Sequence, residues 1–133
     1  HSCIFEKNYV VVSARFAFEK GDADQIRGRM DELAKARREK QPLEFPSAGS
    51  TFKRPEGYFA GKLIQDAGLK GYTVGGAQVS EKHSGFVINR GGATAEEVVF
   101  LIKQVQKKVM KQFNVMMQPE VRFIGFTDTE VRE

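Results

Sequence analysis

The sequence predicts an α+β domain in which helices pack on a mostly antiparallel sheet. Stretches with strand-like alternation or short apolar runs are separated by turns rich in glycine and proline. Two longer stretches instead repeat apolar residues at helical spacing behind residues that cap helices. We expect a sheet made of residues 9–18, the runs beginning at Tyr72 and Phe86 and a strand at Glu120, with the helix after Thr94 packed on one face.

Length and composition fit one globular domain. A chain of 133 residues with 41% hydrophobic and 29% charged residues can bury about two-thirds of the surface that its unfolded form exposes. No apolar run reaches the roughly 18 residues of a membrane span or follows a basic start, so we expect a soluble, cytoplasmic protein. The net charge of +4 could attract nucleic acid, nucleotides or other phosphates and selects none of them. Cys3, His1 and His83 lack metal-site spacing, so no metal is expected.

The first two elements are predicted from alternation and capping. Residues 9–18 alternate as a half-buried strand does, and the eight residues before them lack a start methionine, which suggests a truncated or processed N-terminus. A helix should run from Asp22, with Gln25 in the capping-box position, to about Lys40. One helix face is basic, which suits nucleic acid only with interleaved aromatic residues. None are present and acidic residues dilute the charge, so a solvated face is favoured.

The segment between Pro46 and Pro55 concentrates hydroxyl groups among small residues. Each proline disfavours helix in the residue before it, so we expect irregular, exposed backbone and take the segment as the active loop. Gly49 permits a sharp turn or the close approach of a ligand just before Ser50. By themselves, Ser50 and Thr51 better fit a turn in which the hydroxyls bond their own backbone.

A short helix should follow this loop and end near Gly68, with apolar residues at Ala60, Leu63, Ile64 and Ala67. If its N-terminus points toward Ser50, its free N–H groups would help to bind an anion there.

Two short strands are then expected, at 72–74 and 86–88. The glycine pair at 75–76 is not a dinucleotide fingerprint, because no helix opens behind it in a G-x-G-x-x-G pattern. His83 lies in the polar turn before the second strand. A surface position is favoured, although its place beside Lys82 suits a phosphate contact.

The longest helix is predicted from a capping box formed by Thr94 and Glu97, and Asn114 should end it. Residues 115–126 should return as extended chain. Glu120 starts an apolar run there, so it is either an ordinary edge charge or a partly desolvated acid. Spacing alone favours the edge charge.

Six short motifs stand in order along the chain: AGSTFKRP (48–55), AGKLI (60–64), AGLKG (67–71), GGAQVS (75–80), FVIN (86–89) and PEVRFIG (119–125). Together they resemble the C-terminal part of the UDP-N-acetylenolpyruvoylglucosamine reductases, flavoenzymes of bacterial cell-wall precursor synthesis. Six motifs in one register are more specific than any one of them. Residues 49–57 are similar to the shorter branch of the family.

The resemblance implies that two N-terminal domains bind the flavin and a third supplies the substrate side of the site. Residues 1–5 match the tail of a Tyr-Arg-x-Ser-x-Phe motif that ends the family's FAD domain. We therefore expect a fragment that is inactive alone and holds FAD weakly, with NADPH as the hydride source of the whole enzyme. Its parts would be the end of the FAD-binding domain (1–20), a connecting helix and linker (21–45), the substrate-binding domain (46–126) and a tail (127–133).

The family's proton donor, the serine of a Gly-Ser-x-Phe-Lys motif, carries over to Ser50. Hydride addition at C3 of the enolpyruvyl group leaves C2 to be protonated, and a hydroxyl is a poor acid that needs neighbours stabilising the alkoxide. The family's glutamate carries over to Glu120, which is expected near the enolpyruvyl carboxylate as acid or hydrogen-bonding partner, with a raised pKa in the complex. Lesser candidates for the diphosphate or carboxylate are Lys53, Arg54, Lys82 and His83, although Arg54 replaces an asparagine of the longer branch.

The resemblance thus implies part of a reductase that converts UDP-N-acetylglucosamine enolpyruvate to UDP-N-acetylmuramate, without a nucleic-acid or membrane partner. The alternative is a small basic module that binds RNA or another polyanion. It rests on the net charge and the arginine-rich helix alone.

Overall fold

The computed structural model describes Ile4, Lys7 and residues 9–126. His1, Cys3, the motif expected at residues 1–5 and the tail expected at 127–133 fall wholly or mainly outside the described residues. The chain divides into two units, residues 1–33 and 34–133. The second unit contains the sheet and most of the buried side chains.

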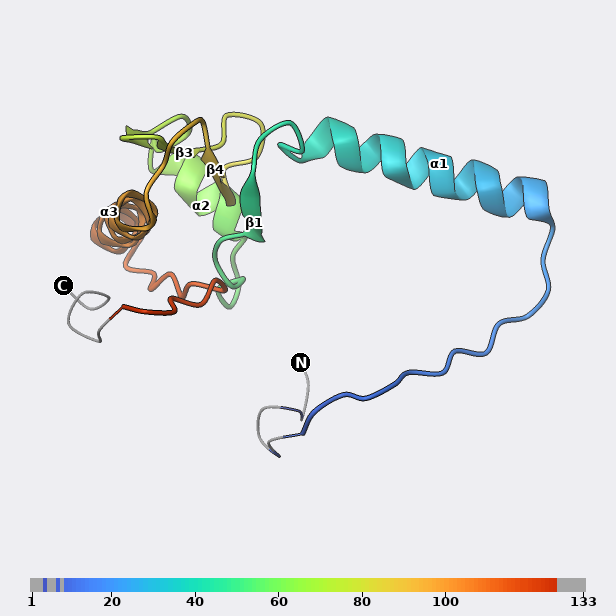
Figure 1. The fold of residues 1–133 in the computed structure, drawn as a ribbon. Coiled ribbons are helices and arrows are strands. Elements are labelled where there is room, and N and C mark those ends of the chain that lie inside the picture. The colour runs from blue at the N-terminus through green and yellow to red at the C-terminus, as the bar shows by residue number, and fades with distance from the viewer. Residues whose placement is uncertain (1–3, 5–6, 8, 127–133) are drawn as a thin grey trace. The chain divides into compact units, whose positions relative to one another are not determined.

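The second unit is built on a four-stranded sheet with the order β1-β4-β3-β2 (Figure 1). Its strands are β1 (Ser47–Ser50), β2 (Thr73–Val74), β3 (Ala77–Val79) and β4 (Phe86–Asn89). Every neighbouring pair is antiparallel. Together with the helices, this sheet confirms the predicted α+β class.

Two helices complete this unit, α2 (Ala60–Asp66) and α3 (Ala95–Phe113). α3 packs against β2, β3 and α2, as predicted for the helix after Thr94. The core lies between these elements and includes the buried side chains of Leu63, Ile64, Leu69, Val79, Leu101, Ile102, Val105, Val109 and Met117. Burial of the apolar stripe of α3 within this core holds the helix on the sheet.

The ends of α3 form as the sequence predicts. Thr94 Oγ1 accepts a hydrogen bond from Glu97 N at 3.2 Å, and Thr94 N donates to Glu97 Oε2 at 3.0 Å, which completes the capping box. Asn114 ends the helix in the left-handed conformation, at φ 54°. The short α2 ends just before Gly68, whose N–H donates to Gln65 O at 2.9 Å and whose φ is 70°.

A tight hairpin joins β2 to β3. The strand β3 was not predicted from the sequence, because it has only three residues and the middle one, Gln78, is polar. Val74 pairs with Ala77 across the two glycines. Gly76 N donates to Glu97 Oε2 at 3.1 Å, and a Cβ on Gly76 would lie 2.5 Å from Gly91 O. The glycines are therefore explained by close packing within this domain.

The expected active loop is a strand over part of its length, which corrects the prediction of irregular backbone. β1 pairs with β4 through Ser47 opposite Ile88 and Ser50 opposite Phe86. β1 holds one more residue than β4 between these pairs, and Gly49 takes a φ of 84° in this bulge. Local composition disfavours a strand here, but pairing with a distant strand outweighs that preference.

The strand predicted at Glu120 is reduced to one isolated bridge between Phe52 and Pro119. Lys53 N donates to Gln118 O at 2.8 Å, and Glu120 N donates to Thr51 O at 2.9 Å. Pro119 thus occupies the position between two ladder hydrogen bonds, where its missing N–H is not needed. The chain bends immediately afterwards, so no longer strand forms.

The strand predicted at residues 9–18 is wrong for this structure. The segment forms no strand, and its apolar side chains are exposed, including Val12 at 92% and Phe18 at 86%. A strand needs a neighbour to take its N–H and C=O groups, and no strand in the described part of the chain pairs with it.

The helix predicted behind Asp22 is present as α1 (Ala23–Lys40). Its start is capped as predicted, because Gln25 N donates to Asp22 Oδ1 at 2.9 Å. None of its residues is buried. On the basic face, Arg29 pairs with Glu32 and Lys35 with Glu39.

Two classes of feature are absent from the described ranges. No described helix has both the length and the hydropathy needed to cross a membrane. Within the same ranges, no cluster of three or more histidine, cysteine or acidic side chains is placed to hold a metal ion.

Candidate functional site

A cavity of about 450 Å³ opens beside the end of β1. Ser50, Arg54, Lys82 and His83 line it together with the first turn of α2, residues 60–62. Four of the six residues expected at the site therefore meet around one hollow. The expectation that the N-terminal turn of α2 lies near Ser50 agrees with this lining, while binding of an anion there stays a prediction.

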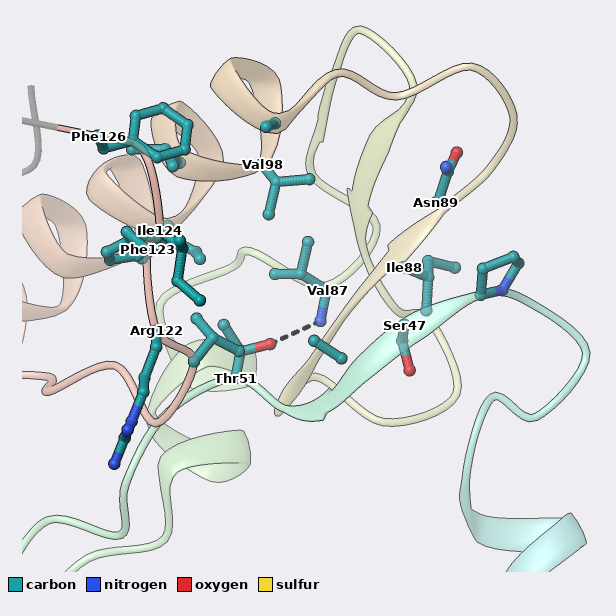
Figure 2. A pocket seen from close by; sticks show the side chains of 16 residues that line it. Ser47, Thr51, Val87, Ile88, Asn89, Val98, Arg122, Phe123, Ile124 and Phe126 are labelled. Atoms are coloured by element: carbon teal, nitrogen blue, oxygen red, sulfur yellow. Dashed lines mark hydrogen bonds between the residues drawn. The ribbon is translucent and has the colours of Figure 1, made fainter. Parts of the chain in front are cut away.

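The structure gives the two neighbouring hydroxyl groups of Ser50 and Thr51 different surroundings. Thr51 is 3% exposed, and its Oγ1 accepts a hydrogen bond from Val87 N at 2.9 Å, which ties the end of β1 to β4 (Figure 2). Ser50 is exposed at the rim of the cavity, directly after the bulge in β1. Thr51 is thus structural, and Ser50 is the hydroxyl that a ligand can reach.

The loop between β3 and β4 is held in shape by buried and ring contacts. Ser80 is buried, and its Oγ accepts hydrogen bonds from Lys82 N at 3.1 Å and His83 N at 3.2 Å. Nδ1 of His83 accepts from Gly85 N at 3.1 Å, so a neutral ring carries its proton on Nε2. The ring stands edge-on to Phe86 with centroids 5.0 Å apart. His83 therefore forms a fixed wall of the cavity.

The first turn of α2 packs closely on this loop. A Cβ added to Gly61 would lie 3.3 Å from both Gly85 N and His83 Cε1. A small residue is therefore favoured at this point of the motif at 60–64. The sequence alone offered no sign that these two segments touch.

Two lysines that line the cavity each have a carboxylate partner. Lys62 Nζ lies 2.6 Å from Asp66 Oδ1, and Lys82 Nζ lies 3.2 Å from Glu44 Oε2. A hydrogen bond from its own backbone, assisted by Lys82, lowers the pKa of Glu44, so this carboxylate stays ionised beside the lysine.

Lys53 and Glu120 do not line this cavity. Lys53 instead borders a second hollow of about 400 Å³ beside residues 114–118, which Arg54 also lines. Glu120 is exposed, and its backbone is joined to Thr51 by the 2.9 Å hydrogen bond between Glu120 N and Thr51 O. The segment that carries Glu120 thus runs beside the residue that follows Ser50.

A larger and mainly apolar cavity of about 580 Å³ lies between β1, β4, α3 and residues 121–126 (Figure 2). None of the six expected site residues lines it. Its walls offer few groups that could act on a polar substrate. We therefore place the candidate site at the smaller, cationic cavity.

Comparison with known proteins identifies the family to which the chain belongs. Residues 41–124 match the family model described as UDP-N-acetylenolpyruvoylglucosamine reductase, C-terminal domain. The chain is 64% identical over 124 residues to the UDP-N-acetylenolpyruvoylglucosamine reductase of Clostridium botulinum (strain Alaska E43 / Type E3), covering 93% of this chain and 41% of the relative. It is 63% identical over 125 residues to that of Agathobacter rectalis, covering 94% of this chain and 40% of the relative.

A solved structure is similar as well. The crystal structure of UDP-N-acetylenolpyruvylglucosamine reductase from Thermus caldophilus matches with a TM-score of 0.61 and 35% identity, over 77% of this chain and 36% of that one. The chain spans about two-fifths of the length of the curated relatives it matches, 41% and 40% in the two cases above. On this basis the chain belongs to the UDP-N-acetylenolpyruvoylglucosamine reductase family, and residues 41–124 match that family's C-terminal domain.

Proposed function

We propose that this chain supplies the substrate side of a cytoplasmic, NADPH- and FAD-dependent reductase. The enzyme would convert UDP-N-acetylglucosamine enolpyruvate to UDP-N-acetylmuramate for peptidoglycan synthesis. One observation carries the proposal: Ser50 stands at the rim of a cavity lined by cationic side chains, in a chain that belongs to this family. The proposal includes neither a nucleic-acid nor a membrane partner.

The glycine pair at 75–76 does not offer a site for the pyrophosphate of FAD. Gly75 and Gly76 are the adjacent glycines that could let a pyrophosphate approach the backbone after a strand. Their open sides are instead filled by the Glu97 carboxylate and by the backbone of residues 91–93. We therefore expect the purified chain to be colourless. The flavin, held mainly by other parts of the whole enzyme, would supply the hydride.

Ser50 is proposed to deliver the proton to C2 of the enolpyruvyl group. A serine hydroxyl gives up a proton only when the alkoxide and the developing substrate charge are stabilised, and Arg54 and Lys82 bring positive charge to the same cavity. Glu120 is proposed to lie near the enolpyruvyl carboxylate. The hydrogen bond that joins its segment to Thr51 supports this placement.

The domain boundaries are proposed in the same way. Residues 1–20 would end the FAD-binding domain, 21–45 would connect, 46–126 would bind substrate, and 127–133 would form a tail. The exposed apolar side chains of residues 9–18 support the first assignment, because an alternating segment of this kind is stable as a strand only beside another strand.

The experiment that tests the function changes Ser50 in a full-length reductase carrying this domain. Stopped-flow absorbance would follow flavin reduction by NADPH and then reoxidation by the enolpyruvyl substrate. Ser50→Ala should leave the first half-reaction intact and slow the second by about 10²–10⁴, the usual loss for a positioned general acid. Ser50→Cys should recover part of the rate, because a thiol is a stronger acid of similar reach.

Ser47→Ala is the matched control, because Ser47 is another exposed serine on β1 and does not line the cationic cavity. It should leave both half-reactions unchanged. Reoxidation of Ser50→Ala at the wild-type rate would show that Ser50 is only a strand residue. Failure of both half-reactions would assign the damage to folding or to shared binding.

The polyanion-binding alternative rests on the basic side chains of α1. Because Arg29 and Lys35 pair with neighbouring glutamates, part of that charge is already neutralised. A steep loss of affinity with salt for any polyanion would support this alternative, whereas selectivity for the UDP-sugar supports the reductase.

A further inference from the structure

Three cationic side chains line the cavity beside Ser50, and two of them already have an anionic partner. Lys62 is paired with Asp66, and Lys82 is paired with Glu44. Within the described residues, no carboxylate lies within ion-pair distance of Arg54. The positive charge that an anionic ligand meets without displacing a carboxylate is therefore that of Arg54.

Arg54 is held by two contacts that leave its outer nitrogens open. The guanidinium carbon lies 4.0 Å from the ring centroid of Phe59, and Nε donates a hydrogen bond to Tyr58 O at 3.1 Å. The ring fixes the guanidinium, and only one of its five N–H donors is used by the carbonyl. The two terminal amino groups remain as a fork that fits two oxygens of one phosphate.

Core packing does not explain Phe59. Its side chain is 64% exposed although it is a large apolar residue, and it does not belong to the hydrophobic core. It precedes α2 at the N-cap position without providing a side-chain cap. Its specific contact is the stack beneath Arg54, and both residues line the cavity.

We propose that Phe59 is a positioning residue that holds Arg54 as the diphosphate-binding group of this cavity. Lys62 and Lys82 each have a carboxylate partner, so Arg54 contributes the most to capture of the anion. The proposal rests on the proposed function, whose substrate carries a diphosphate between its uridine and its sugar. It adds Phe59 as the residue that orients Arg54, and it names the cation that contributes most to binding the diphosphate.

The test measures binding of inorganic pyrophosphate and of UDP-N-acetylglucosamine to this chain. Isothermal titration gives the affinity, and ¹H–¹⁵N spectra follow how the Nε–H signal of Arg54 changes when pyrophosphate is added, a response that a merely structural role of Phe59 would leave unaltered. Phe59→Leu should weaken pyrophosphate binding about two- to fivefold and reduce this response of the Arg54 Nε–H signal. Phe59→Tyr should restore both, because it keeps the ring.

Charge-matched controls separate Arg54 from its neighbours. Arg54→Lys keeps the charge and loses the fork, so it should weaken binding more than Phe59→Leu does. Lys62→Ala removes a charge that Asp66 already partners, so it should leave the affinity close to wild type. Backbone spectra of Phe59→Leu should match the wild-type fold, since the replaced side chain is mostly exposed.

The outcomes distinguish this inference from the proposed function. The inference is overturned if Phe59→Leu binds pyrophosphate as wild type does, if Lys62→Ala costs as much as Arg54→Lys, or if wild type shows no binding at millimolar pyrophosphate. If UDP-N-acetylglucosamine binds at the cavity and the Phe59 variants bind it as tightly as wild type does, the proposed function stands and the inference about Phe59 fails. If pyrophosphate behaves as expected but the UDP-sugar has no advantage over other polyanions, the inference stands and the function fails.

Discussion

The helices α1 and α3 have 18 and 19 residues, and each begins behind a capping side chain, yet only α3 is packed. α3 buries five residues, including Leu101 and Val105, whereas α1 buries none. The apolar positions of α1, such as Ile26 and Leu33, are about half exposed at 50% and 53%. Caps and residue spacing therefore determine where a helix forms, and burial depends on whether another element faces its apolar side.

The largest expected contrast comes from truncating one leucine in each helix. Leu101 is completely buried, so Leu101→Ala should lower the free energy of unfolding of the second unit by about 2–5 kcal/mol. Leu33→Ala should change it by less than about 0.5 kcal/mol, because Leu33 is 53% exposed and does not belong to the core of the described residues. Urea unfolding followed by circular dichroism measures both. An equal loss for Leu33→Ala would show that α1 is packed in solution.

The difference between local signals and long-range packing also explains which elements the sequence predicted and which it missed. All three helices were expected close to their observed bounds because caps and apolar spacing are local signals. Residues 9–18 were expected as a strand from alternation, but strand formation depends on a partner that the described chain lacks. β1 was missed for the opposite reason, since its small residues disfavour a strand and its pairing with β4 is non-local.

The candidate site shows the same limit. Ser50 and Glu120 were selected through a family resemblance, because in isolation their spacing favoured a turn residue and an edge charge. The burial of Thr51 beside the exposed Ser50 depends on its hydrogen bond to Val87, which lies 36 positions away. The stack of Arg54 on Phe59 is five positions apart, yet no helix or strand period predicts it. Tertiary contacts of this kind have no signature in a single sequence.

A second contrast, of intermediate size, compares two glycines. A Cβ at Gly76 would lie 2.5 Å from Gly91 O and 2.6 Å from Ala93 N, and backbone atoms must move to admit it. Gly76→Ala should therefore destabilise the second unit by about 1–3 kcal/mol. Gly28 lies in α1 with no atom within 4 Å of an added Cβ, so Gly28→Ala should stabilise that helix by about 0.5–1 kcal/mol.

The two readouts for these glycines are different. Gly76→Ala should lower the urea midpoint, while Gly28→Ala should leave the midpoint unchanged and increase the helical circular dichroism signal at low temperature. A fall in midpoint for Gly28→Ala would contradict the open space found around an added Cβ at this position. An unchanged midpoint for Gly76→Ala would mean that the backbone at residues 91–93 yields easily.

The smallest effect concerns the start of α3 and depends on pH. Hydrogen bonds from Thr94 N and then from Gly76 N lower the pKa of Glu97 below its ordinary value of 4.5. Because the folded state favours the ionised carboxylate, this contribution to stability is complete above the pKa of the unfolded chain and is lost as the pH falls through the lower folded pKa. Glu97→Gln cannot ionise, so its stability should depend less on pH over this acid range. Glu96→Gln removes the same charge from a neighbouring exposed position and is the control. Urea midpoints measured at a series of acid pH values would test this, and parallel curves for wild type and Glu97→Gln would show that the capping carboxylate adds no pH-dependent stability.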